Sequence, residues 1–203
     1  MKKIITILIV LLSISGYGQV KMDSLTIFNY YDTIVHYTEN DKNRTRLNKY
    51  EKDIKLYIKG EDVKYLKEEI RLIVNELNNL IEPINITITE DSTDYNLLVY
   101  LGNRKGFEGI NNDIKGVRCL GYGIIYCGYK NSIILSECFV DIKKVKTPIR
   151  QKHILREEIT QCLGLINDTY QYDNSIFYEG YSEVTQYSDL DKEIIKMLYN
   201  KVN

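Results

Sequence analysis

The sequence lacks an apolar run long enough to cross a membrane. Its most hydrophobic stretch, Ile4 to Leu12, falls well short of the about 20 residues that a spanning helix needs. Two lysines precede this stretch and the small residues of 13–18 follow it, which is the three-part pattern of a secretory signal peptide. We therefore predict an exported protein, secreted or periplasmic, with residues 1–18 cleaved between Gly18 and Gln19. No cysteine stands at that junction, so no membrane anchor is expected after cleavage.

The chain also has no run of basic residues with interleaved aromatics, and it contains neither alanine nor tryptophan. Its net charge is −1, and removal of Lys2 and Lys3 takes it to −3, so nucleic acid is excluded as an expected partner. The missing residue types, beside abundant Ile, Lys, Asn and Tyr, indicate AT-rich coding and carry no function. Without repeats or low-complexity linkers, we predict an N-terminal extension over residues 19–50 and one domain over residues 51–203.

Cysteines at zinc-site spacing are missing too. The four cysteines all lie in the part that would be exported, where oxidation is permitted. Cys119 and Cys127 flank a short glycine-rich segment and are the expected local disulfide. Cys162 follows an apolar helical stripe, so a small buried thiol and a bridge to Cys138 both stay open for it.

What is present is an alternation of strand and helix patterns. Residues 25–35 have apolar positions that suit a helix, whereas 39–52 are polar and 102–121, rich in Gly and Asn, are expected to form a long surface loop. The expected strands are 54–58, 84–89, 96–101, 123–127 and 132–142. The expected helices are 61–82, 148–163 and 189–200. This order predicts an α/β (α+β) fold, in which a mixed twisted sheet of about five strands has an antiparallel edge hairpin, a backing helix, a central helix and a C-terminal helix.

The central helix carries the most informative stretch, His153 to Asp168. Its spacing resembles the metzincin zinc-protease pattern H-E-x-x-H-x-x-G-x-x-H, often followed by Asp, with all three metal-binding histidines replaced. The corresponding positions are Glu157, Glu158, Gln161, Gly164, Asn167 and Asp168. In the order of that pattern they are a metal position, the general base, a second metal position, the sharp turn, a third metal position and the trailing acid.

A longer resemblance supports the motif. The phrase Glu-Glu-x-x-Gln-x-Leu-Gly-Leu-x-Asn-Asp, then Ser175-Ile176-Phe177 and a Leu-Tyr that ends at Tyr199, is similar to a family of exported bacterial proteins. That family is catalogued only as a domain of unknown function and is grouped with zincin-like peptidases. The resemblance covers roughly Leu97 to the C-terminus and implies a metzincin-like sheet and central helix.

The donor chemistry at these positions argues against zinc. Glu157 and Gln161 share a helix face, but the amide oxygens of Gln161 and Asn167 are poor zinc ligands. An oxygen-only set suits Ca²⁺ or Mg²⁺ better, if Asp168 or water contributes. His153, four residues before Glu157 on the same face, is an alternative metal partner. We expect no cofactor, and a hydrogen-bond network of Glu157, Gln161 and Asn167 that fixes the turn after Gly164.

Two functions follow. In the first, the chain is a pseudo-peptidase, a module that binds an extended peptide or protein along the strand at 123–127. In the second, it is an unconventional metal-dependent hydrolase with Glu157, Gln161 and Asn167 as ligands and Glu158 as general base. In either case four tyrosines are candidates to line the cleft, namely Tyr170, Tyr172, Tyr178 and Tyr181.

Overall fold

The computed structural model describes residues 22–37 and 45–200. The predicted signal peptide and its cleavage site lie outside these residues. Within them, the strands are β1 (Ile54–Gly60), β2 (Ile86–Thr89), β3 (Leu97–Gly102), β4 (Gly121–Cys127) and β5 (Ile133–Asp141). The helices are α1 (Ser24–His36), α2 (Lys64–Asn78), α3 (Arg104–Glu108), α4 (Pro148–Gln161) and α5 (Asp189–Tyr199), with 3-10 turns η1 (Asn112–Ile114) and η2 (Tyr129–Asn131).

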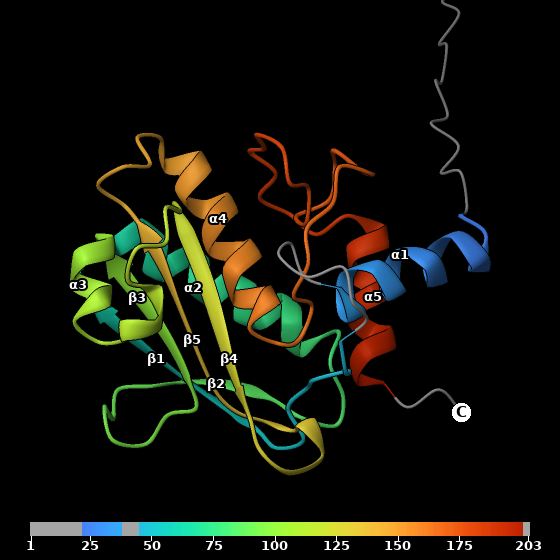
Figure 1. Ribbon diagram of the computed structural model, residues 1–203, viewed down its shortest axis with the longest axis horizontal. Helices are drawn as coiled ribbons and strands as arrows, with labels where there is room; N and C mark the ends of the chain where they lie inside the picture. Colours follow the sequence, from blue (N-terminus) through green and yellow to red (C-terminus); the bar gives the residue numbers. More distant parts are fainter. Residues whose placement is uncertain (1–21, 38–44, 201–203) are drawn as a thin grey trace, which may run out of the picture.

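The described strands form one mixed sheet in the order β2-β1-β3-β5-β4. β2, β1, β3 and β5 are parallel, and β4 pairs antiparallel with β5 as the edge hairpin. The predicted α/β fold with five strands and an antiparallel edge hairpin is therefore confirmed. Figure 1 shows α4 and α2 on one side of this sheet and α3 at its far end.

Alternation along the strands divides the core between the two faces of the sheet. Val99, Cys138 and Val140 face the main core, which α2 and α4 cover. Phe139 faces the opposite side, where a smaller cluster forms with Phe107 and Ile114. The Phe107 and Phe139 rings stack with centroids 4.9 Å apart.

That smaller cluster corrects the prediction for residues 102–121. The segment contains α3 and η1, and Phe107 and Ile114 are fully buried, so it is a cover for the second face of the sheet. Asn111 fastens it there by donating hydrogen bonds to the Glu137 carboxylate at 2.5 Å and the Tyr126 hydroxyl at 2.7 Å.

Smaller corrections concern where elements begin and end. The backing helix α2 starts at Lys64 with Val63 as its N-cap, so Glu61 and Asp62 precede its first turn. The predicted starts of two other helices are confirmed. Thr147 caps α4 and Pro148 is its first residue, and Ser188 and Asp191 form a capping box at the start of α5.

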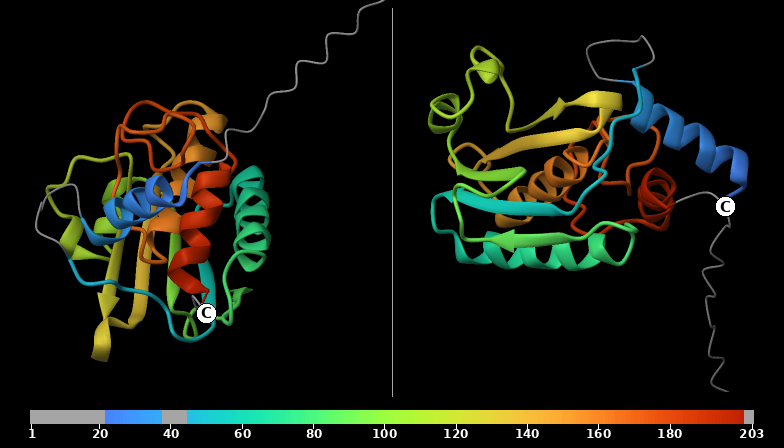
Figure 2. Two further views of the ribbon diagram at one scale, coloured as in Figure 1. Left: turned by 90° about the vertical axis from the view of Figure 1, so that its right-hand side faces the viewer. Right: turned by 90° about the horizontal axis from the view of Figure 1, so that it is seen from below.

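Helix α1 packs beside α5 at one end of the molecule, as Figures 1 and 2 show. It buries Tyr30, Tyr31, Ile34 and Val35 in the main core, whereas Leu25 is exposed. Phe28 is exposed as well. In the described ranges, no helix combines the length and apolar character that a bilayer span requires.

Candidate functional site

Helix α4 packs against the sheet, and its residues also contact the C-terminal loops. Leu155 and Ile159 are fully buried, and the Gln151 amide donates to the carbonyl oxygens of Val145 at 2.7 Å and Ile142 at 3.2 Å. After the helix, Gly164 has φ +109°, a backbone conformation that side chains with a Cβ rarely adopt. The predicted turn at Gly164 is therefore present.

The hydrogen bonds beyond the turn differ from the predicted network. Gln161 donates its amide to the Asp168 carboxylate at 2.7 Å. Asn167 instead faces α1, where its backbone N–H donates to the Ile34 carbonyl and its amide to the Thr33 carbonyl, both at 3.1 Å. The expectation that Asn167 turns back toward Glu157 and Gln161 is wrong, because Asn167 satisfies the carbonyl groups at the end of α1.

His153 lies deep beside Glu157. Its Nδ1 is 2.8 Å from the Val184 carbonyl oxygen, and because a carbonyl can only accept, Nδ1 carries the proton. Nε2 then presents its lone pair toward the Glu157 carboxylate, 3.7 Å away. Burial lowers the pKa of His153 to about 4, so the imidazole is neutral near pH 7 in spite of that carboxylate.

Glu158 is buried against the edge strand β4. A Cβ placed on Gly121 would lie 2.5 Å from Glu158 Oε1, and one on Gly123 would lie 3.3 Å from Oε2. These two glycines therefore make the space that the carboxylate occupies. Burial, and after it the Glu158 charge, raise the pKa of Cys119 to about 11, so that thiol stays protonated.

The residues at the metal-equivalent positions do not fit zinc. Gln161 and Asn167 are amides tied to different partners, one to Asp168 and the other to α1. Across the part of the chain that the structure describes, no three His, Cys, Asp or Glu side chains gather as a metal-binding group. The three metal-equivalent positions themselves supply neither an imidazole nor a thiolate, the donors that zinc prefers besides carboxylate.

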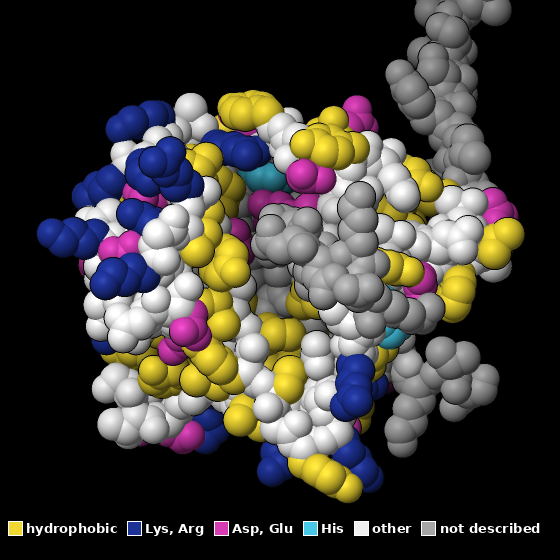
Figure 3. Space-filling view, in the orientation of Figure 1, with side chains coloured by type: hydrophobic (Ala, Val, Ile, Leu, Met, Phe, Trp, Pro, Cys, Tyr) yellow, Lys and Arg dark blue, Asp and Glu magenta, His cyan; other side chains and the backbone are white. Residues whose placement is uncertain are grey.

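The four tyrosines of the C-terminal loops differ in burial and in their ring contacts. Tyr172 packs edge-on against Tyr30, with ring centroids 5.0 Å apart. Tyr170 and Tyr181 are 66% and 74% exposed, and Tyr178 contacts Tyr170 edge-on. Figure 3 shows a hollow in the surface beside β4. Hydrophobic side chains form one wall of this hollow, and acidic side chains and a histidine form another.

Sequence reasoning missed the buried ion cluster behind α4. Arg156 is 1% exposed, donates to Glu69 at 2.9 Å and to Glu76, and stacks on the Tyr187 ring at 4.6 Å. Lys152 pairs with the same Glu69 at 3.0 Å. The helical neighbours of Arg156, namely Lys152, Glu157 and Thr160, are polar, so no local pattern indicated that Arg156 is buried.

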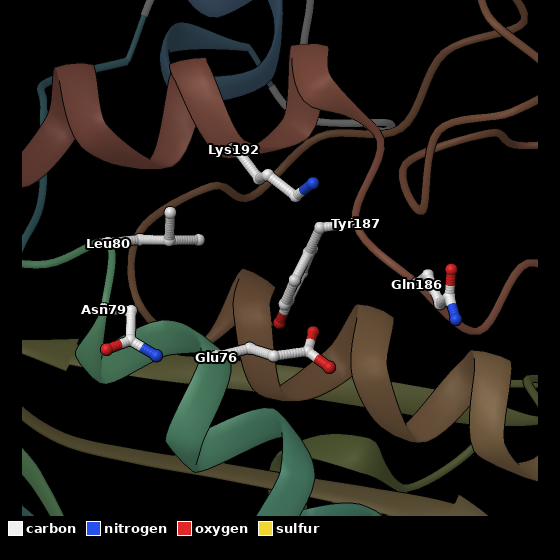
Figure 4. A pocket seen from close by; sticks show the side chains of 6 residues that line it. All are labelled: Glu76, Asn79, Leu80, Gln186, Tyr187 and Lys192. Carbon is white, nitrogen blue, oxygen red and sulfur yellow. The ribbon is translucent and has the colours of Figure 1, made fainter.

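A shallow cavity of about 340 Å³ opens next to this cluster. Figure 4 shows Lys192 of α5 reaching toward the Tyr187 ring and Glu76 of α2 on the opposite wall, with Gln186 directed away. Asn79 and Leu80 complete the lining. None of the residues predicted from the motif takes part, and the Glu76 charge is already balanced by Arg156.

The two predicted disulfide partners lie at opposite ends of β4. The strand separates Cys119 from Cys127 by roughly 20 Å at about 3.3 Å per residue, far beyond the about 7 Å that a disulfide allows between Cα atoms. The pairing does not fit this geometry, and all four cysteines are free thiols in the structure.

Comparison with known proteins gives a family and a distant structural likeness. No curated protein matches the sequence. Two solved structures of myroilysin are similar: one at 13% identity with a TM-score of 0.46, covering 74% of this chain and 80% of that one, the other at 12% and 0.48, covering 81% and 89%. Residues 25–202 match the family described as "Protein of unknown function (DUF2927)", and the chain therefore belongs to that family.

Proposed function

We propose that this protein is exported and binds an extended peptide segment of another protein along the free edge of β4. The observation that carries the proposal is the edge itself. β4 is the last strand of the described sheet, and the hollow in Figure 3 lies beside it. An edge strand with unpaired backbone groups is a template for adding one more strand.

The register identifies the backbone groups that a peptide would meet. Asp141 N–H donates to the Leu120 carbonyl at 2.7 Å, so Leu120 faces β5. In an antiparallel pair, bonding toward the partner alternates residue by residue. The N–H and C=O groups of Gly121, Gly123 and Ile125 therefore face away from β5, toward the side of β4 on which no other described strand lies. A peptide paired there would run over the position of Glu158.

The hydrogen bonds around α4 support binding over hydrolysis. The Asn167 amide donates a hydrogen bond to a carbonyl of α1, and the Gln161 amide donates one to Asp168. Both amides therefore stabilise the fold. A general base such as Glu158 acts in a zincin through a metal-bound water. Without a ligand set to hold that metal, its carboxylate is better suited to contact a bound peptide.

The test is to select peptides from a library of random extended decapeptides and to measure binding of the selected synthetic peptides by fluorescence polarisation. Ile125→Pro removes one outward N–H and should weaken binding at least tenfold. Ile125→Ala loses the same packing but keeps the N–H, so it should stay within a few-fold of the parent. Equal affinity for Ile125→Pro and the parent protein, with both folded by circular dichroism, would refute edge pairing.

The hydrolase alternative keeps one favourable observation, the carboxylate of Glu158 buried where a paired peptide would lie. It requires Glu157, Gln161 and Asn167 to hold a divalent metal. Metal analysis of untagged protein, with peptide cleavage by the parent and by Glu158→Gln, separates the two functions. Stoichiometric metal after gel filtration, together with cleavage lost in Glu158→Gln, would replace the binding proposal.

A further inference from the structure

Two buried cysteines, one from the sheet and one from a helix, face each other beneath β4. Cys138 lies on β5 and Cys162 is the C-cap of α4, and both are fully buried. In the β4–β5 register Cys138 is directly opposite Gly123, so their side-chain positions share one face of the sheet. A Cβ on Gly123 would lie 3.4 Å from Cys162 Sγ.

The glycine explains why the two thiols can meet. Any side chain at position 123 would occupy the space between the strand and the end of α4. With only a hydrogen there, the Cys162 thiol reaches under β4 to the Cys138 side. The neighbouring Cys162 thiol, and burial after it, raise the pKa of Cys138, which agrees with two thiols in mutual contact.

We propose that Cys138 and Cys162 form a disulfide bond, which fastens the C-terminal end of α4 to β5. The bond rests on export, as the proposed function does, because it needs an oxidising compartment. The bond would form by thiol–disulfide exchange with an oxidant that itself carries a disulfide. The two protein sulfurs join, two electrons reduce the oxidant's disulfide, and the two protein protons end on the oxidant's thiols. Cys119 and Cys127 stay as thiols.

The bond would link the two elements that border the proposed peptide-binding edge. β5 is the strand on which β4 is built, and α4 carries Glu158 one turn before Cys162. A covalent link at this point fixes the distance between Glu158 and the edge strand. The closed loop, residues 138–162, includes all of α4.

The experiment uses full-length protein expressed with its own N-terminus and recovered outside the cytoplasm without reductant. Thiols are alkylated in denaturant before and after reduction, and the intact mass is measured. We expect two of the four cysteines to react before reduction and all four after it. Non-reducing digestion should yield a linked peptide pair that contains Cys138 and Cys162.

Matched variants make the assignment specific. The double variant Cys119→Ser, Cys127→Ser should keep the bond, with no alkylation before reduction, whereas Cys138→Ser should show three reactive thiols. The bond should also raise the melting temperature by roughly 5 to 10 °C over the reduced form. Four reactive thiols in exported protein, or a linked pair containing Cys119 or Cys127, would overturn the proposal.

Oxidation of purified, reduced protein in vitro distinguishes a failure of export from a failure of the disulfide proposal. Refolding in glutathione disulfide should give the same Cys138 to Cys162 link whatever the compartment of origin. Protein that refolds to the same circular dichroism spectrum but leaves both thiols reduced, or that links other cysteines, would overturn the proposal independently of export and of peptide binding.

Discussion

Replacing Gly164 by alanine tests the turn on which the candidate site depends. The glycine has φ +109°, and a Cβ there would lie 2.0 Å from the carbonyl oxygen of Asn48, a backbone atom that cannot rotate away. The unfavourable φ costs about 1–3 kcal/mol. The contact must also push apart the turn and the segment that leads into β1, so we expect a total loss of about 3 kcal/mol or more.

Gly116→Ala is the matched control. Gly116 also has a positive φ, +87°, but a Cβ there would have no heavy atom within 4 Å. It therefore reports the conformational cost alone, about 1–2 kcal/mol. The difference between the two variants isolates the contact with Asn48.

Urea unfolding and thermal melting followed by circular dichroism provide the measurement. For a domain of this size, 1 kcal/mol corresponds to about 2–4 °C, so Gly164→Ala should melt roughly 6–12 °C below the parent. If Gly164→Ala loses no more stability than Gly116→Ala, the close approach of the turn to Asn48 is absent and the geometry argued for the end of α4 is incorrect.

Three further predictions address the interior. Arg156→Met removes the buried partner of the Glu69 carboxylate and leaves it Lys152, so it should lower the free energy of unfolding by roughly 3 kcal/mol in urea. Glu76→Gln, at a carboxylate that is 42% exposed, should cost about 1 kcal/mol or less. The pKa of His153 falls from 6.5 to about 4 on folding, so the unfolded chain binds the proton more tightly. The stability that the neutral imidazole contributes is complete above pH 6.5 and is lost as the pH falls toward 4, by up to about 3 kcal/mol, and in His153→Gln the pH profile should lose this component. Tyr50→Phe deletes a buried hydroxyl that makes two hydrogen bonds of 2.6 Å and should cost about 1–2 kcal/mol; an unchanged urea midpoint would contradict those bonds.

The sequence was most informative where structure is set by neighbouring residues. Thr147 before Pro148, and Ser188 three residues before Asp191, mark the starts of α4 and α5 through bonds made within a single turn. Gly164 likewise stops α4 because of its own backbone freedom. These features needed no knowledge of distant contacts.

Features decided by distant contacts were not predicted. The 102–121 segment has the glycine and asparagine content of a loop, but Phe107 packs on Phe139, and that burial makes α3 part of the core. Asn167 has its partner in Thr33, 134 positions earlier, which no local pattern indicates. For Cys162 the sequence left two alternatives open, a buried thiol and a bridge to Cys138, and it is the β4–β5 register that places Cys138 opposite Gly123 and near Cys162.

The bond between α1 and the turn also governs when the site can assemble. α1 is the first described helix to leave the ribosome. The Thr33 carbonyl can be bonded only after Asn167 has been synthesised, and the helix face that carries Tyr30 and Ile34 can be buried only after α5 has been synthesised. Closing so long a loop costs little extra stability, because the entropy grows only with the logarithm of length, but such distant contacts slow folding. Until synthesis ends, α1 exposes an apolar face without a partner. We therefore expect a truncated chain that lacks α5 to aggregate through α1, and the turn bearing Asn167 to become ordered late in folding.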